Sequence, residues 1–220
     1  MNYNELINYT GILGAVLFII TTIIGGYLFD DYSHFSQYIS ESYASGTEYG
    51  HLLRWYGYIP SGLLMGGFCF VVAIQLERNK YVFYGLIGFG ILYGIFTSLV
   101  SVFPCDFSCN RDYSNSSISQ ILHSVLSVFT YTLTPVSLFF FSIGSKKIGG
   151  FQLFAKISLF LCIFGFIFGM LFLVNANSPI SGLLQRNTEA IYLIWLILLS
   201  IFVIKNNILK LKPVANKGYK

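Results

Sequence analysis

The sequence contains unusually few charged residues. Only 10% of its 220 residues are Asp, Glu, Lys or Arg, whereas a water-soluble domain carries roughly 25%. A surface with so little charge excludes an ordinary soluble globular protein, because most of that surface must contact something other than water. The basic residues are not clustered with stacking aromatic residues, so a nucleic-acid-binding protein is not expected either.

Histidine and cysteine are also scarce, at three and four residues. Without a second C-x₂-C or histidine pair, the chain lacks the usual ligand pattern of a zinc site. We therefore assign no metal ligands, and the identity of any cofactor is left open. The G-x-S-x-G motif of serine hydrolases is missing as well. No lysine lies in the middle of a long apolar run, which excludes a retinal protein.

What the sequence has instead is apolar and aromatic residues, which make up 55% and 18% of it. A helix needs about 20 mainly apolar residues to cross the hydrocarbon core of a membrane. Segments of about this length lie near residues 8–29, 56–76, 81–103, 120–143, 153–174 and 189–205. We therefore predict an all-α membrane protein, in which six transmembrane helices form one domain over residues 1–220. In the last segment, Tyr192 and Trp195 are expected at the membrane interface.

Lysine and arginine are distributed unequally between the two sides of this bundle. An even number of spans places both termini on one side, together with ten of the thirteen basic residues: Arg78, Lys80, Lys146, Lys147, Lys156, Lys205, Lys210, Lys212, Lys217 and Lys220. The other side has only Arg54, Arg111 and Arg186. The positive-inside rule then predicts a multi-pass protein of the cell membrane with both termini in the cytoplasm. Most acidic residues fall on the outer side: Asp30, Asp31, Glu41, Glu48, Asp106, Asp112 and Glu189.

The first outer segment, 30–55, contains apolar residues at helical spacing: Tyr32, Phe35, Tyr38, Ile39 and Tyr43. Asp30 or Asp31 is suited to cap the start of such a helix. We predict an amphipathic helix lying in the outer membrane interface, with a re-entrant lid as the alternative.

A second outer motif follows the third span, in the order Phe103-Pro104-Cys105-Asp106-Phe107-Ser108-Cys109. Pro104 is expected to end the helix. Cys105 and Cys109 are four residues apart on the oxidising side of the membrane, which favours a local disulfide. Spacing alone leaves two free thiols as the alternative.

One face of the fourth span is polar, because Gln120, His123, Ser127, Thr130 and Thr134 recur every three or four residues. Lipid penalises such a face, so it should point into the bundle or into a water-filled cavity. Serine and threonine there are also typical of helix–helix hydrogen bonds. An ionisable residue inside a span is by default a functional candidate, which singles out His123. Its alternative role is that of an interhelical hydrogen-bond donor.

Other outer-side candidates are Ser40 and Glu41 in the first segment and Gln185 and Arg186 before the last span. An arginine at this position is suited to bind an anionic ligand with two hydrogen bonds. Pairing with Asp106 or Glu41, and anchoring to lipid phosphates, are the alternatives for Arg186.

Four short motifs occur in a fixed order: Tyr38-Ile39-Ser40-Glu41, Phe103-Pro104-Cys105-Asp106, Leu122-His123 and Leu184-Gln185-Arg186. Together they resemble the bacterial and archaeal membrane proteins grouped as domain-of-unknown-function family 998, over nearly the whole chain. The resemblance implies a six-helix fold and no particular reaction. Many relatives have a second histidine four residues before the one matching His123, where this chain has Ser119. A two-histidine metal site is therefore not expected on this helix.

These observations lead to two hypotheses of different classes. In the first, an outward-facing polar site binds or processes a lipid headgroup or small amphiphile. If it is catalytic, His123 is the general base and Asp106 orients it, or both bind a metal. The predicted ligand-binding residues are Ser40, Glu41, Gln120, Ser127, Gln185 and Arg186.

In the second hypothesis the chain is a non-catalytic structural or accessory subunit of a membrane complex, and its polar residues hold the loops together. Membrane lipids are the expected partners in either case. A homo-oligomer and a larger complex are both compatible with the sequence, which also leaves open whether the protein is an enzyme.

Overall fold

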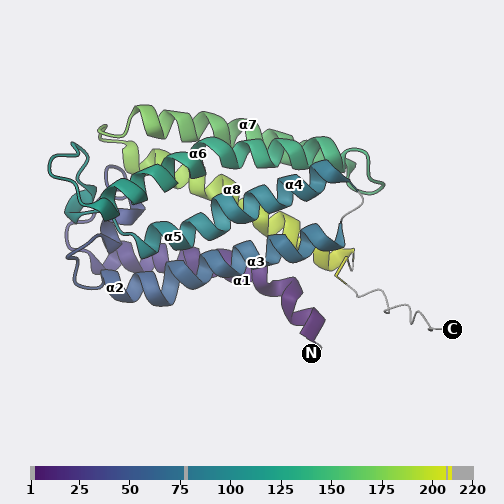
Figure 1. Cartoon of the computed structure of the whole chain (residues 1–220), viewed down its shortest axis with the longest axis horizontal. Coiled ribbons are helices and arrows are strands. Elements are labelled where there is room, and N and C mark those ends of the chain that lie inside the picture. Colours follow the sequence, from purple (N-terminus) through teal and green to yellow (C-terminus); the bar gives the residue numbers. More distant parts are fainter. Residues whose placement is uncertain (1–2, 77–78, 207, 210–220) are drawn as a thin grey trace.

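Six long helical rods lie side by side in the computed structural model, which describes residues 3–76, 79–206 and 208–209 (Figure 1). Each is long and apolar enough to cross a membrane. The rods are α1 (Tyr3–Leu28), α2 with α3 (Gly50–Leu53 and Ile59–Gln75), α4 with α5 (Lys80–Phe89 and Phe96–Val102), α6 (Ile118–Ser145), α7 (Gln152–Val174) and α8 (Ser181–Lys205). No strand occurs in the described ranges. The predicted all-α, six-helix membrane fold is confirmed.

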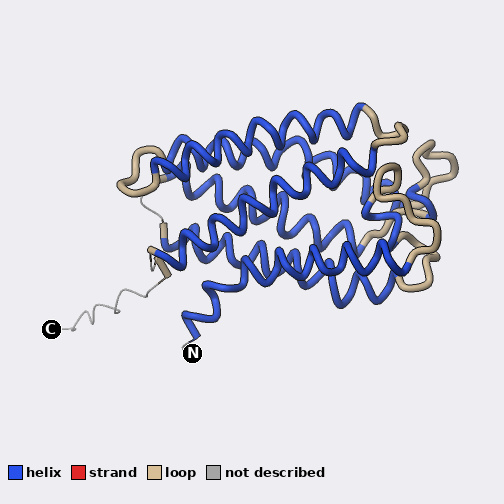
Figure 2. Tube along the Cα trace, turned by 180° about the vertical axis from the view of Figure 1, so that it is seen from behind, coloured by secondary structure: helices blue, strands red, loops and turns tan. Residues whose placement is uncertain are grey.

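The two ends of the bundle differ in character. One end holds the long connections 29–49, 103–117 and 175–180, which gather on the right in Figure 2. We call it the loop end. At the opposite end, here the terminal end, α1 begins and α8 stops (Figure 1). Helix α6 packs between α4 and α7, while α1 packs on α3 and α8.

The core is aromatic, and at its centre the ring of Trp195 is fully buried. Its centroid lies 4.4 Å from that of Phe89 and 5.3 Å from that of Phe141. Tyr192 is also fully buried, so neither it nor Trp195 is the interface residue that the sequence suggested. The reason is that α8 begins at Ser181, eight residues before the predicted span, which places both residues near mid-helix.

Two irregularities in the helices position groups at the loop end. A π-helical segment, Gly90–Ile95, joins α4 to α5 and contains the buried Tyr93. Pro135 interrupts α6 and has no N–H for the carbonyl of Tyr131, four residues before it. The hydroxyl of Tyr192 reaches that carbonyl at 3.4 Å instead. Both irregularities thus lie beside tyrosines that belong to the site described below.

The first loop differs from the predicted interfacial helix. Its helical part is only a five-residue 3₁₀ helix, Ile39–Tyr43, and all five residues are buried. The remainder of 30–55 is turns and, from Gly50, the start of the second rod. The segment therefore enters the end of the bundle, as in the re-entrant alternative, because its polar groups find partners there rather than in water.

Candidate functional site

A cavity of about 540 Å³ lies at the loop end, between α6, the last turn of α7 and the first turns of α8. One part of its wall is polar: Ser40, Arg111, Gln120, His123, Ser124, Ser127, Asn177 and Gln185. The apolar lining residues are Val128 of α6, Phe172, Leu173 and Val174 of α7, and Ala176 after α7. Tyr38, Cys109, Tyr113 and Tyr131 complete the lining. We call this space the loop-end cavity.

His123 is buried and lines the loop-end cavity. Its Nδ1 lies 2.9 Å from the carbonyl oxygen of Val100 and 3.0 Å from that of Phe103. Carbonyl oxygens only accept hydrogen bonds, so Nδ1 must have the hydrogen. In the neutral ring Nε2 is then a hydrogen-bond acceptor, and it has no partner among the described residues. The two carbonyls at the end of α5 thus fix the ring so that a basic nitrogen is available.

Other polar side chains of α6 form a row next to His123. The Nε2 amide of Gln120 donates to Ser124 Oγ at 3.1 Å, and its Oε1 accepts from the backbone N–H of Asp106 at 2.9 Å. The hydroxyl of Ser127 donates to the carbonyl of His123 at 2.8 Å, which leaves its oxygen lone pairs free to accept. His123 Nε2 and the Ser127 oxygen therefore offer acceptors to the loop-end cavity, and the hydroxyl of Ser124 offers a donor.

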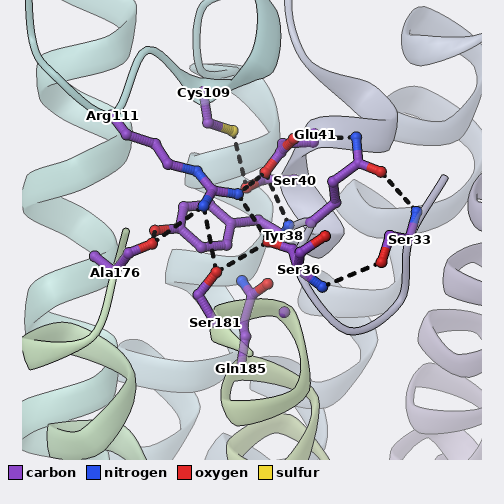
Figure 3. A network of polar contacts seen from close by, with 12 residues as sticks. Ser33, Ser36, Tyr38, Ser40, Glu41, Cys109, Arg111, Ala176, Ser181 and Gln185 are labelled. Carbon is purple, nitrogen blue, oxygen red and sulfur yellow. Dashed lines mark hydrogen bonds and ion pairs between the residues drawn. The ribbon is translucent and has the colours of Figure 1, made fainter. Parts of the chain in front are cut away.

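Arg111 holds three segments together at the rim of the loop-end cavity (Figure 3). It forms an ion pair with Glu41, and it donates to the carbonyls of Ser36 at 2.9 Å and Ala176 at 3.2 Å. Its guanidinium also stacks 4.1 Å from the ring centre of Tyr38. The Glu41 side chain is only 4% exposed, so the charge of Arg111 compensates an almost fully buried carboxylate.

Tyr38 adds a neutral hydrogen bond to this arrangement. Burial raises the pKa of its phenol to about 12, so it keeps its hydrogen at neutral pH. That hydroxyl donates to the carbonyl of Ala176 at 2.5 Å. The loop after α7 is therefore attached to the first loop by both Tyr38 and Arg111.

A second polar network leads from the loop-end cavity into the bundle. Gln185 Oε1 accepts from the backbone N–H of Ile39 at 2.8 Å, so its other terminal atom is the amide nitrogen, which donates to Tyr131 at 3.0 Å. Tyr131 in turn donates to Glu189 at 2.6 Å, and Tyr93 donates to the other carboxylate oxygen at 2.8 Å. Glu189 is buried about two turns inside α8.

A much smaller space of about 30 Å³ lies next to Glu189, and we call it the inner chamber. It shares part of its wall with the loop-end cavity: Ser40, His123, Ser127, Tyr131 and Gln185. The remaining lining is Phe18, Ile39, Tyr43, Thr97, Val100, Thr130 and Glu189. The inner chamber and the loop-end cavity are therefore adjacent, and these shared side chains line both of them.

Asp106 and Arg186 line neither of these two spaces. The carboxylate of Asp106 accepts from the backbone N–H of Ser117 at 3.0 Å, and the Ser117 hydrogen bonds lower its pKa. Arg186 donates to the carbonyls of His34 at 2.9 Å and Gln37 at 2.8 Å. Both residues fasten loops, so His123 is oriented by carbonyls and not by Asp106.

The predicted disulfide between Cys105 and Cys109 is present. It is buried, and Cys109 Sγ lies 3.2 Å from the hydroxyl of Ser40. The backbone carbonyl of Cys105 also accepts from the N–H of Ser45 at 2.8 Å. The bridge lies within the loop after α5, and hydrogen bonds of its two cysteines attach that loop to the first loop beside the loop-end cavity.

Five of the residues proposed from sequence lie together on the wall of the loop-end cavity: Ser40, Gln120, His123, Ser127 and Gln185. Glu41 lies behind them and contacts the cavity through Arg111. Sequence reasoning did not select Arg111, which is a single basic residue in a loop without periodicity. It also placed Glu189 on the outer surface, because hydropathy located the start of the last span at that residue.

Within the described ranges, no group of three or more His, Cys, Asp and Glu residues is arranged to hold a metal ion. The chain matches the family model described as "Protein of unknown function (DUF998)" over residues 12–201. No curated protein and no solved structure matches it.

Proposed function

The chain belongs to the DUF998 family, whose description names no activity, and we propose from its own geometry that it binds a lipid headgroup or small amphiphile in the loop-end cavity. The observation on which this depends is the division of the cavity wall. Polar side chains of α6 and Gln185 line a space of about 540 Å³ together with Val128 and the apolar end of α7. A molecule with a polar head and an apolar chain satisfies both halves of such a wall.

The place of the cavity supports access from the membrane. Val128 and Val174 line it and are 45% and 78% exposed, on surfaces of α6 and α7 that face outward. An acyl chain can therefore leave the cavity along these helices without crossing a polar barrier, while its headgroup stays at the level of the loops.

The hydrogen-bond pattern favours a headgroup that donates. His123 Nε2 and the Ser127 oxygen have lone pairs to offer, since their neighbouring hydrogens are directed to carbonyls. Hydroxyl and ammonium headgroups match this arrangement, and a quaternary choline does not. If the protein also processes its ligand, His123 Nε2 is the group positioned to take a proton from a hydroxyl or a water.

A binding titration with two zwitterionic short-chain lipids tests this proposal in purified protein. We expect phosphatidylethanolamine to bind about 3–10-fold more tightly than phosphatidylcholine, the ratio that one hydrogen bond supplies. His123→Ala should abolish that preference. Equal affinities in the wild-type protein would contradict the proposed headgroup chemistry.

Filling the cavity gives a second test with a matched control. Val128→Trp should displace a lipid that native mass spectrometry detects on the wild-type protein. Val125→Trp, on the same helix and equally exposed but not part of the wall, should keep it. Retention of the lipid by both variants would show that it binds elsewhere.

We also propose that the protein lies in the cell membrane with its loop end outside. The distribution of lysine and arginine along the sequence supports this orientation. Asn177→Cys, in the loop after α7, should react with a membrane-impermeant thiol reagent added to intact cells. Reaction only after the membrane is permeabilised would reverse the orientation.

The structural hypothesis is favoured by one specific observation, namely that Arg111 and Arg186 direct their guanidinium groups at loop carbonyls and Glu41. A purely structural role for the cavity residues predicts that His123→Ala lowers the melting temperature in detergent without changing lipid binding. The binding site predicts reduced lipid binding by a variant that keeps most of its stability.

A further inference from the structure

We infer that the inner chamber beside Glu189 binds a small monovalent cation. Na⁺ is the ion with which this inference is tested. This site is separate from the proposed amphiphile site and does not depend on it. The argument starts from the charge of Glu189, which is only 8% exposed and lies within a membrane-spanning helix. A buried carboxylate without a compensating charge is strongly disfavoured.

No basic side chain compensates Glu189. Among the described residues the only ion pair joins Arg111 to Glu41. Arg186 precedes Glu189 by one helical turn, yet its guanidinium donates to the carbonyls of His34, Gln37 and Gly182 and to the hydroxyl of Tyr32. The negative charge of Glu189 therefore lacks a cationic partner in the protein itself.

Both oxygens of Glu189 accept from a tyrosine hydroxyl, an arrangement that stabilises an ionised carboxylate. Tyr131 accepts from the Gln185 amide, so its single hydrogen is directed to Glu189 Oε1. Tyr93 contacts Oε2 at 2.8 Å, and its hydroxyl has no other partner in the described part of the chain. If Glu189 were protonated on Oε2 and directed that proton at Tyr93, the hydrogen of Tyr93 would be left without an acceptor in a fully buried position.

The inner chamber adds further oxygen ligands to the carboxylate. The hydroxyl of Thr97 donates to the carbonyl of Tyr93 at 2.5 Å, and that of Thr130 lies 2.9 Å from the carbonyls of both Leu92 and Leu126. Ser127 similarly donates to a carbonyl of its own helix. With their hydrogens engaged, these three oxygens present lone pairs to the chamber, which is the environment of a hard cation.

Size and charge select a monovalent ion. The chamber volume of about 30 Å³ accommodates roughly one water molecule or an ion of similar size. A single carboxylate neutralises a single positive charge, whereas Ca²⁺ and Mg²⁺ sites generally contain more carboxylates or retain several waters. The ion would enter from the loop-end cavity, with which the chamber shares His123 and Ser127.

The π-helical segment Gly90–Ile95 gives independent support for a functional site here. Such segments are rare and are frequent at functional sites. This one contains Tyr93, which donates to Glu189, and its Leu92 carbonyl accepts from Thr130. The irregular backbone thus supplies two of the contacts that shape the chamber.

The test measures the melting temperature of the purified wild-type protein, without added lipid, in NaCl and in choline chloride at equal ionic strength. A ligand at about 100 times its dissociation constant should raise the melting temperature by about 5–10 °C. We expect a saturable rise with Na⁺ only. Equal curves in the two salts would overturn the inference. The lipid titration is not affected by this outcome, so the two proposals can fail separately.

Three variants test whether the response to Na⁺ comes from the inner chamber. Glu189→Gln keeps the side-chain volume but removes the charge, and it should abolish the Na⁺ response. Thr130→Val should weaken Na⁺ binding in equilibrium measurements with radioactive sodium, even if Glu189→Gln does not fold. Thr132→Val is its matched control, since Thr132 does not line the chamber and its hydroxyl donates to Val128 within α6. Unchanged Na⁺ binding in Thr130→Val, or in Glu189→Gln, would contradict the site.

Discussion

Glu41 and Glu189 are both almost fully buried at the loop end, yet only Glu41 has a cationic partner in the protein. Glu41 lies in a loop and has an arginine partner, together with the backbone N–H of Tyr38 at 3.0 Å. Glu189 lies in a transmembrane helix and has two tyrosine hydroxyls but no cation from the protein. A carboxylate that only holds a structure is expected to be neutralised locally. A carboxylate without a cationic partner inside a membrane is the better candidate for reversible binding of a cation.

The largest effect is expected when Glu41 loses its cationic partner, Arg111. Arg111→Met keeps much of the aliphatic volume but leaves the carboxylate buried and unpaired. We expect a loss of about 3–5 kcal/mol in unfolding free energy, the usual effect of breaking a buried ion pair. Unfolding in detergent measures this loss, and Glu41→Gln combined with Arg111→Met should recover part of it. A loss below about 1 kcal/mol would mean that water already compensates Glu41.

Removing a donor from Glu189 tests the other side of the comparison. Tyr93→Phe deletes one hydrogen bond to a charged acceptor and should cost about 1.5–3 kcal/mol. Tyr131→Phe deletes the other such bond and also leaves the Gln185 amide without its acceptor, so it should cost at least as much. If a cation occupies the inner chamber, Na⁺ should offset part of that loss in each variant. Tyr192→Phe is the control, because its hydroxyl makes only long contacts with two carbonyls, 3.4 Å to Tyr131 and 3.5 Å to Gly165, and does not reach Glu189. Equal losses in all three variants would show that the tyrosines matter only for packing.

A substitution of Arg186 measures how much of the attachment of the first loop does not depend on Glu41. Lysine cannot reproduce the planar group in which one nitrogen donates to the carbonyls of His34 and Gln37 and the other donates to the Tyr32 hydroxyl. Arg186→Lys should therefore cost about 1–2 kcal/mol and should increase proteolysis in the first loop. Unchanged proteolysis would indicate that the Arg111–Glu41 pair holds this loop alone.

Asp106 should give the smallest effect, since it is a partly exposed carboxylate outside both clusters. The hydrogen bonds from Ser117 hold its pKa below the ordinary value of 3.8. A lowered folded-state pKa stabilises the protein fully above the unfolded value, and this contribution is lost as the pH falls through the folded value. Asp106→Asn should thus cost less than about 1 kcal/mol at neutral pH.

The same substitution should flatten the dependence of the melting temperature on pH below about pH 4, where the wild-type carboxylate takes up its proton. Melting curves of both proteins across that interval measure the difference. An identical slope in the two proteins would contradict a stabilising role for the ionised Asp106.

The sequence predicted the helices well because hydrocarbon imposes a length and a polarity that can be read locally. It also predicted that the polar face of α6 points away from lipid, and Gln120, His123, Thr130 and Thr134 on that face are buried. It missed the first two turns of α8, since Gln185 and Arg186 made them look like a loop. Polar residues that are satisfied inside a bundle have the same hydropathy as polar residues in water.

Arg111 and Glu189 were missed for a related reason. The ion pair of Arg111 with Glu41 joins residues 70 positions apart, and no local pattern reports such a contact. Glu189 becomes an intramembrane residue only when the true start of α8 is known. The compensation of buried charge depends on tertiary contacts, so it could not be derived from spacing.

Attachment sites of a photoactivatable phosphatidylethanolamine on the protein in native membranes would test the amphiphile site most directly. Peptide mass spectrometry should find the headgroup-linked probe concentrated on α6 and on the end of α7, near Ser124, Val128 and Phe172. Val128→Trp should remove this labelling and Val125→Trp should not. Labelling spread evenly over the lipid-facing helices, and unchanged by Val128→Trp, would contradict a site in the loop-end cavity.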